Sequence, residues 1–133
     1  MKFRNALFTG MATFAACVVS VSSASATAGW QSLGNSYFYA TSGSSCHTKH
    51  FSSGGGEIRI GYWRPGDTES IDDLKVWESD PNNPDDFIGT IRMMDGWAPK
   101  QINVGTFTDG DNGKAEIYVA GPCTGDPWVH IDD

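Results

Sequence analysis

Short runs of alternating apolar and polar residues, separated by turn-forming residues, constrain this chain most. Side chains alternate in this way over residues 57–62 and 73–77. A period of two is typical of a strand with one buried and one solvated face. Clusters of Gly, Pro, Asn, Asp and Ser interrupt the chain at short intervals, and no long helical period appears after residue 28. The pattern therefore indicates an all-β protein.

The apolar runs predict the order of the strands. We expect them at residues 35–41, 47–51, 57–63, 72–78, 87–94, 101–107, 115–120 and 127–131. Seven to eight antiparallel strands in so short a chain favour a two-sheet β-sandwich. Neither an internal repeat nor a linker interrupts residues 29–133, so we expect a single β-sandwich domain there.

The first 28 residues have the pattern of a secretory signal peptide. Lys2 and Arg4 precede a mostly apolar stretch, and two A-x-A cleavage sites end at Ala26 and Ala28. Cleavage after Ala28 would release a secreted, extracellular domain. Cys17 offers the alternative of a lipoprotein signal, although apolar residues continue beyond it. The apolar stretch is too short to span a membrane comfortably, so we expect no transmembrane segment in the mature chain.

The mature chain would be strongly acidic. Loss of Lys2 and Arg4 leaves seven basic residues against sixteen acidic ones, a net charge of −9. Such a charge disfavours nucleic acid as a partner and favours cations or a basic protein. Two cysteines remain, Cys46 and Cys123, and an even pair in an oxidising compartment predicts a disulfide. This bridge would contribute about 4 kcal/mol to stability in the chain-entropy model.

Three acids surround the loop at residues 79–86. Glu78 ends the strand before the loop, Asp80 follows two positions later, and Asp86 precedes the next apolar run. Carboxylates clustered in this way are the usual ligands of Ca²⁺. The segment 74–89 resembles the third calcium loop of C2 domains, in which a strand ends in an acid, further acids follow two and eight positions on, and two apolar residues and a glycine complete the pattern. The resemblance implies an eight-stranded antiparallel sandwich that holds Ca²⁺ at one tip, with these three acids as ligands.

The alternation of strand direction predicts which loops share an end of the sandwich. If successive strands run up and down, the loops 79–86 and 108–114 lie at one end, and Cys46 and Cys123 lie together at the other. The count adds Asp109 and Asp111 to the candidate calcium ligands. The alternative is that both acidic segments are turns without metal, since Asp, Asn, Pro and Gly are also the residues that turns require.

No catalytic motif accompanies these acids, and we expect a binding protein rather than an enzyme. One alternative is a secreted inhibitor or toxin that acts on another protein. Another is a carbohydrate-binding module with Trp97, in a predicted loop, as an exposed ligand contact, while core packing claims most other tryptophans. His47 and His50, three positions apart on a predicted strand, should point to opposite faces and not share a metal. The sequence does not name the protein or carbohydrate partner.

Overall fold

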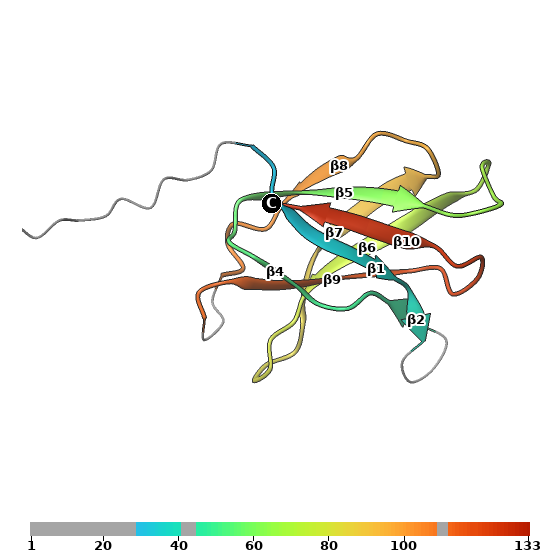
Figure 1. Cartoon of the computed structure of the whole chain (residues 1–133). Coiled ribbons are helices and arrows are strands. Elements are labelled where there is room, and N and C mark those ends of the chain that lie inside the picture. Colours follow the sequence, from blue (N-terminus) through green and yellow to red (C-terminus); the bar gives the residue numbers. More distant parts are fainter. Residues whose placement is uncertain (1–28, 41–44, 109–111) are drawn as a thin grey trace, which may run out of the picture.

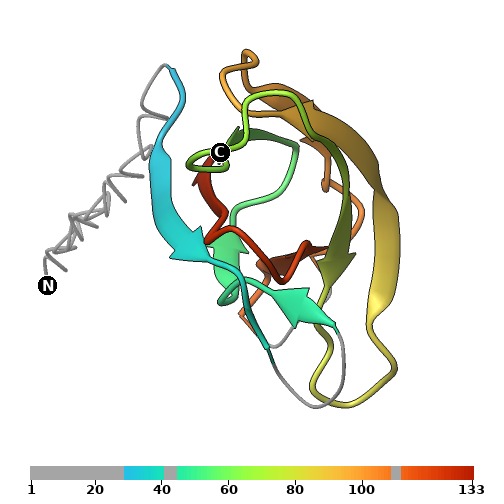
Figure 2. The ribbon, with the colours of Figure 1, turned by 90° about the vertical axis from the view of Figure 1, so that its right-hand side faces the viewer.

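The computed structural model describes residues 29–40, 45–108 and 112–133. Two antiparallel sheets pack face to face, and the confirmed architecture is an all-β sandwich (Figure 1). The first sheet has the order β1-β10-β5-β8, and the second has β2-β3-β9-β6-β7 with β4 also paired to β9. Figure 2 shows both sheets curving around one interior. Among the described residues no helix is long and apolar enough to cross a membrane.

Ten strands form these sheets within the described residues. They are β1 (Ser32–Tyr37), β2 (Tyr39–Ala40), β3 (Cys46–His47), β4 (Phe51–Ser53), β5 (Glu57–Trp63), β6 (Ile71–Glu78), β7 (Asp86–Met94), β8 (Lys100–Asn103), β9 (Ala115–Gly121) and β10 (Trp128–Asp132).

The expected number of seven to eight strands was too low because two predicted strands are each divided. The run 35–41 forms β1 and β2, since Phe38 still pairs with the first sheet through Pro127 whereas Tyr39 pairs with the second. The run 47–51 is interrupted where the Thr48 hydroxyl accepts a hydrogen bond from Val119 N, in place of a regular ladder bond. The run 101–107 ends early, in a turn after Asn103.

The alternating residues turn one face of each strand into the core. Ile58, Ile60 and Tyr62 of β5 are inward and almost fully buried, while Arg59 and Trp63 point outward. Residues 74 and 76 of β6 are inward in the same way. The buried apolar cluster comprises Phe51, Ile58, Ile60, Tyr62, Leu74, Val76, Ile91, Met93, Val104, Ala115, Ile117, Val119, Val129 and Ile131.

Gly121 closes the inner face of β9 at a point where no side chain fits. A Cβ there would lie 2.6 Å from Phe38 Cε1 and 2.9 Å from Leu74 Cδ2. Real Cβ atoms do not approach other atoms so closely, so the glycine lets Phe38 and Leu74 fill this part of the core.

The predicted disulfide is present. Cys46 and Cys123 are bonded, with 5.2 Å between their Cα atoms and a sequence separation of 77 residues. Cys46 is buried and pairs with Gly121 through the β3–β9 ladder. The bridge therefore fastens the short strand β3 to the end of β9.

The predicted arrangement of loops is confirmed for the described residues. Glu78, the last residue of β6, pairs with Ile117 near the start of β9, and Ser79 N donates a 2.8 Å hydrogen bond to Glu116 O. The loops that follow β6 and precede β9 thus share one end of the sandwich. Cys123 follows the other end of β9. Asp109 and Asp111 lie outside the described residues.

Candidate binding face

The acidic loop was the first candidate site, and its carboxylates differ in exposure and do not come together as a metal site. Glu78 is on the inner side of β6 and is only 1% exposed. Asp86 pairs with Glu78 across the β6–β7 ladder but is exposed to solvent. Within the described part of the chain, no three His, Cys, Asp or Glu side chains come together as a metal site.

Asp80 and Asp85 have partners inside the protein. Asp80 accepts hydrogen bonds from Asn82 N at 2.8 Å and from Asn83 Nδ2 at 2.7 Å. The Asn83 side chain first, and then the backbone N–H of Asn82, lower the pKa of Asp80. Asp85 accepts a 2.7 Å hydrogen bond from the Tyr118 hydroxyl. These are turn and loop contacts, and the described carboxylates do not fit a calcium site by themselves.

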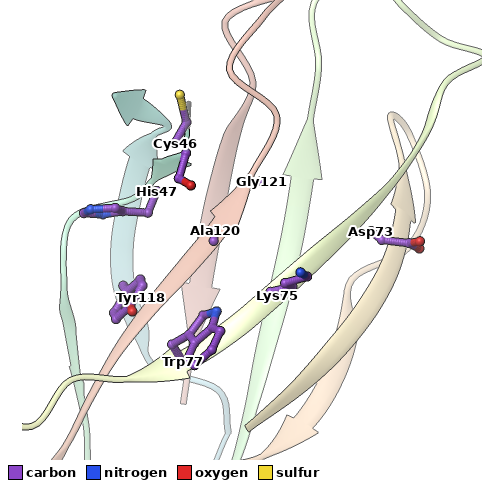
Figure 3. Close-up of a pocket in the computed structure, with 9 residues that line it drawn as sticks. Cys46, His47, Asp73, Lys75, Trp77, Tyr118, Ala120 and Gly121 are labelled. Carbon is purple, nitrogen blue, oxygen red and sulfur yellow. The ribbon is translucent and has the colours of Figure 1, made fainter. Parts of the chain in front are cut away.

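A hollow on the outer face of the second sheet is a stronger candidate. It has a volume of about 450 Å³. Its lining residues come from β3, β6, β9 and the segment before β3, and they are Ser45, Cys46, His47, Asp73, Lys75, Trp77, Tyr118, Ala120 and Gly121. Figure 3 shows Ala120 between the side chains of His47, Tyr118, Trp77 and Lys75. We call this space the hollow.

Strand register explains why the surface is hollow there. Outward-facing Ala120 pairs with His47 on one side and Lys75 on the other. At the next pair of outward-facing positions on β9 and β6, Tyr118 pairs with Trp77. The Ala120 methyl group thus lies among four long side chains. Because the methyl group is much shorter than these side chains, the space above Ala120 stays open.

Six rings lie on this face in two groups, one of four rings and one of two. His47 lies between Tyr39 and Tyr118, with ring centroids 5.3 Å and 5.2 Å away. His50 stacks on Tyr118 at 5.3 Å. Across the strands, the rings of Trp77 and Phe87 are 5.0 Å apart. Tyr39 and Phe87 are 46% and 50% exposed, so apolar ring surface remains available to a ligand.

The expectation that His47 and His50 point to opposite faces was wrong. Residues 48–50 are not a strand, so the period of two does not hold between His47 and His50. Both rings contact Tyr118 and lie on the same side of the sheet. His47 Nδ1 is hydrogen-bonded to Thr48 O at 2.8 Å, which orients the ring beside Tyr118.

Charged groups complete the hollow. Asp73 is 3.5 Å from Arg92 on the neighbouring strand. The Lys75 side chain has no hydrogen bond or ion pair to any residue that the structure describes, and its ammonium group can donate to a ligand. Burial and then the bond to Asp85 raise the pKa of Tyr118, so its hydroxyl stays protonated. The hollow can therefore stack a ring against Trp77 and Tyr118 and hydrogen-bond polar groups of the same ligand.

The tryptophans are more exposed than the sequence suggested. Trp30, Trp63 and Trp97 are 37–39% exposed, and Trp77 and Trp128 are half-buried. Trp97 is exposed as predicted, with Lys100 Nζ 4.9 Å from its ring centroid, but it is not part of the hollow. The alternation in 73–77 and 115–120 could have revealed Lys75, Trp77 and Tyr118 as outward residues on adjacent strands.

Comparison with known proteins assigns the chain to a family without assigning an activity. Residues 32–131 match the family model described as the YndA coiled coil domain. The described part of this match consists of strands and their connections. The chain is 34% identical over 91 residues to a relative from Bacillus subtilis strain 168, described as "Uncharacterized protein YndA". The alignment spans 68% of this chain and 63% of the relative's length. No solved structure matches. The chain therefore belongs to the family described by the YndA coiled coil domain.

Proposed function

We propose that this protein is a secreted binding module that holds an extracellular glycan in the hollow of the second sheet. The observation that carries the proposal is the arrangement of side chains around Ala120. Aromatic rings lie there together with two hydrogen-bonding groups, the Lys75 ammonium and the His47 imidazole. Sugar rings have apolar C–H faces and polar edges. Aromatic rings bind the first, and hydrogen-bonding side chains bind the second.

Charge and shape support a glycan over two other classes of ligand. The acidic chain repels nucleic acid at long range. The apolar area is divided between separate rings with polar groups between them, whereas the core of a protein–protein interface is more continuously apolar. Secretion enters the proposal through the N-terminal signal pattern, and the disulfide is consistent with an oxidising compartment.

Binding to an array of neutral and acidic oligosaccharides tests the proposal. The intact mature chain should bind at least one class, and Trp77→Ala should weaken that binding by tenfold or more. Ala120→Leu should also weaken it, because the larger side chain fills the hollow while leaving the buried face of β9 unchanged. Trp97→Ala is the matched control, since it removes an exposed tryptophan outside the hollow.

Two results would contradict this assignment. If Trp97→Ala removes glycan binding and Trp77→Ala does not, the site is at the 95–99 turn. If the protein binds no glycan but captures a protein through the face around Trp77, it acts as an effector on that protein.

The calcium site implied by the resemblance to C2 domains remains a separate prediction. Its described acids lack the required convergence, so it depends on Asp109 and Asp111, which lie outside the described residues. The glycan proposal uses neither acid and no metal ion.

A further inference from the structure

A second row of aromatic side chains crosses the outer face of the first sheet. Tyr37 of β1 pairs with Trp128 of β10, which pairs with Trp63 of β5. Their neighbours Val129 and Tyr62 are buried in the core, so these three side chains point outward. Tyr37 is 64% exposed and Trp63 is 37% exposed. We call these three residues the aromatic row.

The aromatic row has a defined geometry. The rings of Trp63 and Trp128 stack with centroids 4.2 Å apart and an angle of 8° between their planes. The Trp63 ring leans over Gly61, where a Cβ would be 2.8 Å from Trp63 Cη2. The glycine thus provides the space in which this ring lies against the sheet. Tyr37 and Trp128 border a small cavity of about 160 Å³ with Asn35 and Ser36.

A fixed polar network lies beside the aromatic row. His130 is hydrogen-bonded through Nδ1 to Asn35 and through Nε2 to Asp132 Oδ1 at 2.7 Å. Asp132 Oδ2 accepts hydrogen bonds from Arg59 Nε at 2.9 Å and Nη2 at 2.7 Å. The Arg59 guanidinium lies 5.0 Å from the Trp30 ring centroid. These side chains are held in place before any ligand arrives, which lowers the entropy cost of binding.

The charges of this network indicate the kind of ligand. Arg59 and Asp132 form an ion pair at 2.7 Å and neutralise each other. A ligand with a net charge would find no uncompensated partner in this pair. A neutral sugar would place its apolar face on the aromatic row and its hydroxyl groups over the polar network.

We propose that the aromatic row is a second binding site, for a neutral glycan, on the sheet opposite the hollow. This inference rests on the proposed glycan function and extends it. The two sites lie on opposite outer faces of one sandwich, so a single molecule can hold two glycan chains. Cross-linking of polymers then follows from two sites on one rigid body.

The experiment measures how many oligosaccharides bind. Cellohexaose, chitohexaose and maltohexaose are each titrated against the mature protein by calorimetry, with native mass spectrometry to count bound molecules. The expected result is two equivalents of one of these neutral sugars. Tyr37→Ala and Trp77→Ala should each reduce the count to one, and the double variant should bind none. Trp97→Ala should keep both.

A second measurement tests cross-linking. Hydroxyethyl cellulose, glycol chitin and soluble starch are the corresponding polymers, and light scattering reports their association. The wild-type protein should raise the scattering, whereas Tyr37→Ala and Trp77→Ala should each abolish the rise. Thermal melting confirms that the variants fold. Trp128→Leu, which removes the stacked ring but keeps an apolar side chain, provides a second variant of the aromatic row.

The outcomes separate this inference from the function on which it rests. A single equivalent that is lost with Trp77→Ala and unaffected by Tyr37→Ala overturns the second site and leaves the hollow as the binding site. A single equivalent that is lost only with Tyr37→Ala and Trp128→Leu supports the aromatic row and shows that the hollow binds none of these neutral sugars; the hollow is overturned as well if it binds no acidic oligosaccharide. Binding of none of the three sugars overturns the second site, and binding of acidic oligosaccharides in the hollow would then still support the proposed function.

Discussion

The Tyr118 hydroxyl donates a 2.7 Å hydrogen bond to Asp85, and this bond joins the acidic loop to the edge of the hollow. The ring of Tyr118 contacts both His47 and His50. One side chain thus connects the loop that the sequence singled out with the ring cluster that the sequence did not reveal.

Removing that hydroxyl separates its two roles. Tyr118→Phe keeps the ring in the cluster but loses the bond to Asp85, which should cost about 1 kcal/mol of unfolding free energy. Glycan binding should fall by less than threefold, since the stacking surface is retained. Urea denaturation and the oligosaccharide titration measure the two effects. Tyr118→Ala is the comparison variant, and equal glycan affinities for the two variants would contradict a stacking role for the ring.

Asp80 should behave as a turn residue. Asp80→Ala removes the acceptor for Asn82 N and Asn83 Nδ2, and it should lower the melting temperature with or without calcium. The measurement is a thermal melt in EDTA and in millimolar Ca²⁺. A wild-type protein stabilised by calcium, together with a variant that loses only this calcium-dependent part, would instead support the C2-like site.

Acid should destabilise the fold. Burial raises the pKa of Asp132, but hydrogen bonds from Arg59 and His130 outweigh it and lower the pKa overall. Bonds from the Ser70 side chain and backbone lower the pKa of Asp67. A carboxyl group whose pKa is lower in the folded state stabilises the fold above its unfolded value, about 3.9 for Asp, and this contribution disappears as pH falls through the folded value. Unfolding free energy should therefore decline below about pH 4. Asp132→Asn should show a smaller decline, and an equal decline would rule out this carboxylate as a source.

Reduction of the disulfide should weaken glycan binding in the hollow. The disulfide at Cys46 holds β3, the strand that carries His47. β2, which carries Tyr39, pairs with β3. The described residues 46–47 provide only a short ladder to β9. Reduction at a temperature where the protein stays folded should lower affinity in the hollow. The Cys123→Ser change, which removes the same bridge, should lower binding at the aromatic row by less. Unchanged affinity in the hollow after complete reduction, verified by mass, would show that β2 and β3 hold their positions without the bridge.

Gly61→Ala tests the geometry of the aromatic row. The new methyl group needs the space that the Trp63 ring occupies, so the ring must move away from the sheet. We expect an altered near-ultraviolet circular dichroism signal from the Trp63 and Trp128 pair and weaker binding of the second sugar equivalent. Gly66→Ala is unsuitable as a control because its φ of +79° strains any side chain. Ser52→Ala, an exposed change on β4, serves instead.

The sequence was sufficient to predict the sandwich, the disulfide and the end at which each described loop lies. Alternating residues in β5 and β6 reveal their buried faces directly, and an up-and-down course of strands is the simplest connection of such a chain. The two divided strands could not be foreseen, because a change of sheet at Phe38 and a side-chain bond from Thr48 depend on tertiary contacts.

The candidate site was harder to predict, for a physical reason. The hollow needs residues from β3, β6 and β9 in one register. The local pattern of apolar and polar residues does not determine the order of the strands in a sheet. The acids of the loop 79–86 are close together in sequence, and this closeness predicted a metal site there. In the folded protein Glu78 faces inward and Asp80 is hydrogen-bonded within its own turn. These carboxylates are therefore close in sequence but do not meet in space.

The missing side chain at Gly121 has a consequence for how relatives of this chain can diverge. Positions 38, 74 and 121 share one volume of the core, and the Phe38 and Leu74 side chains already fill the part that a Cβ at 121 would need. A substitution at 121 therefore requires that both the residue at 38 and the residue at 74 become smaller or move. These three positions should therefore vary together across the family, as a compensating set, while the outward residues beside them on β9 are free to change with the ligand.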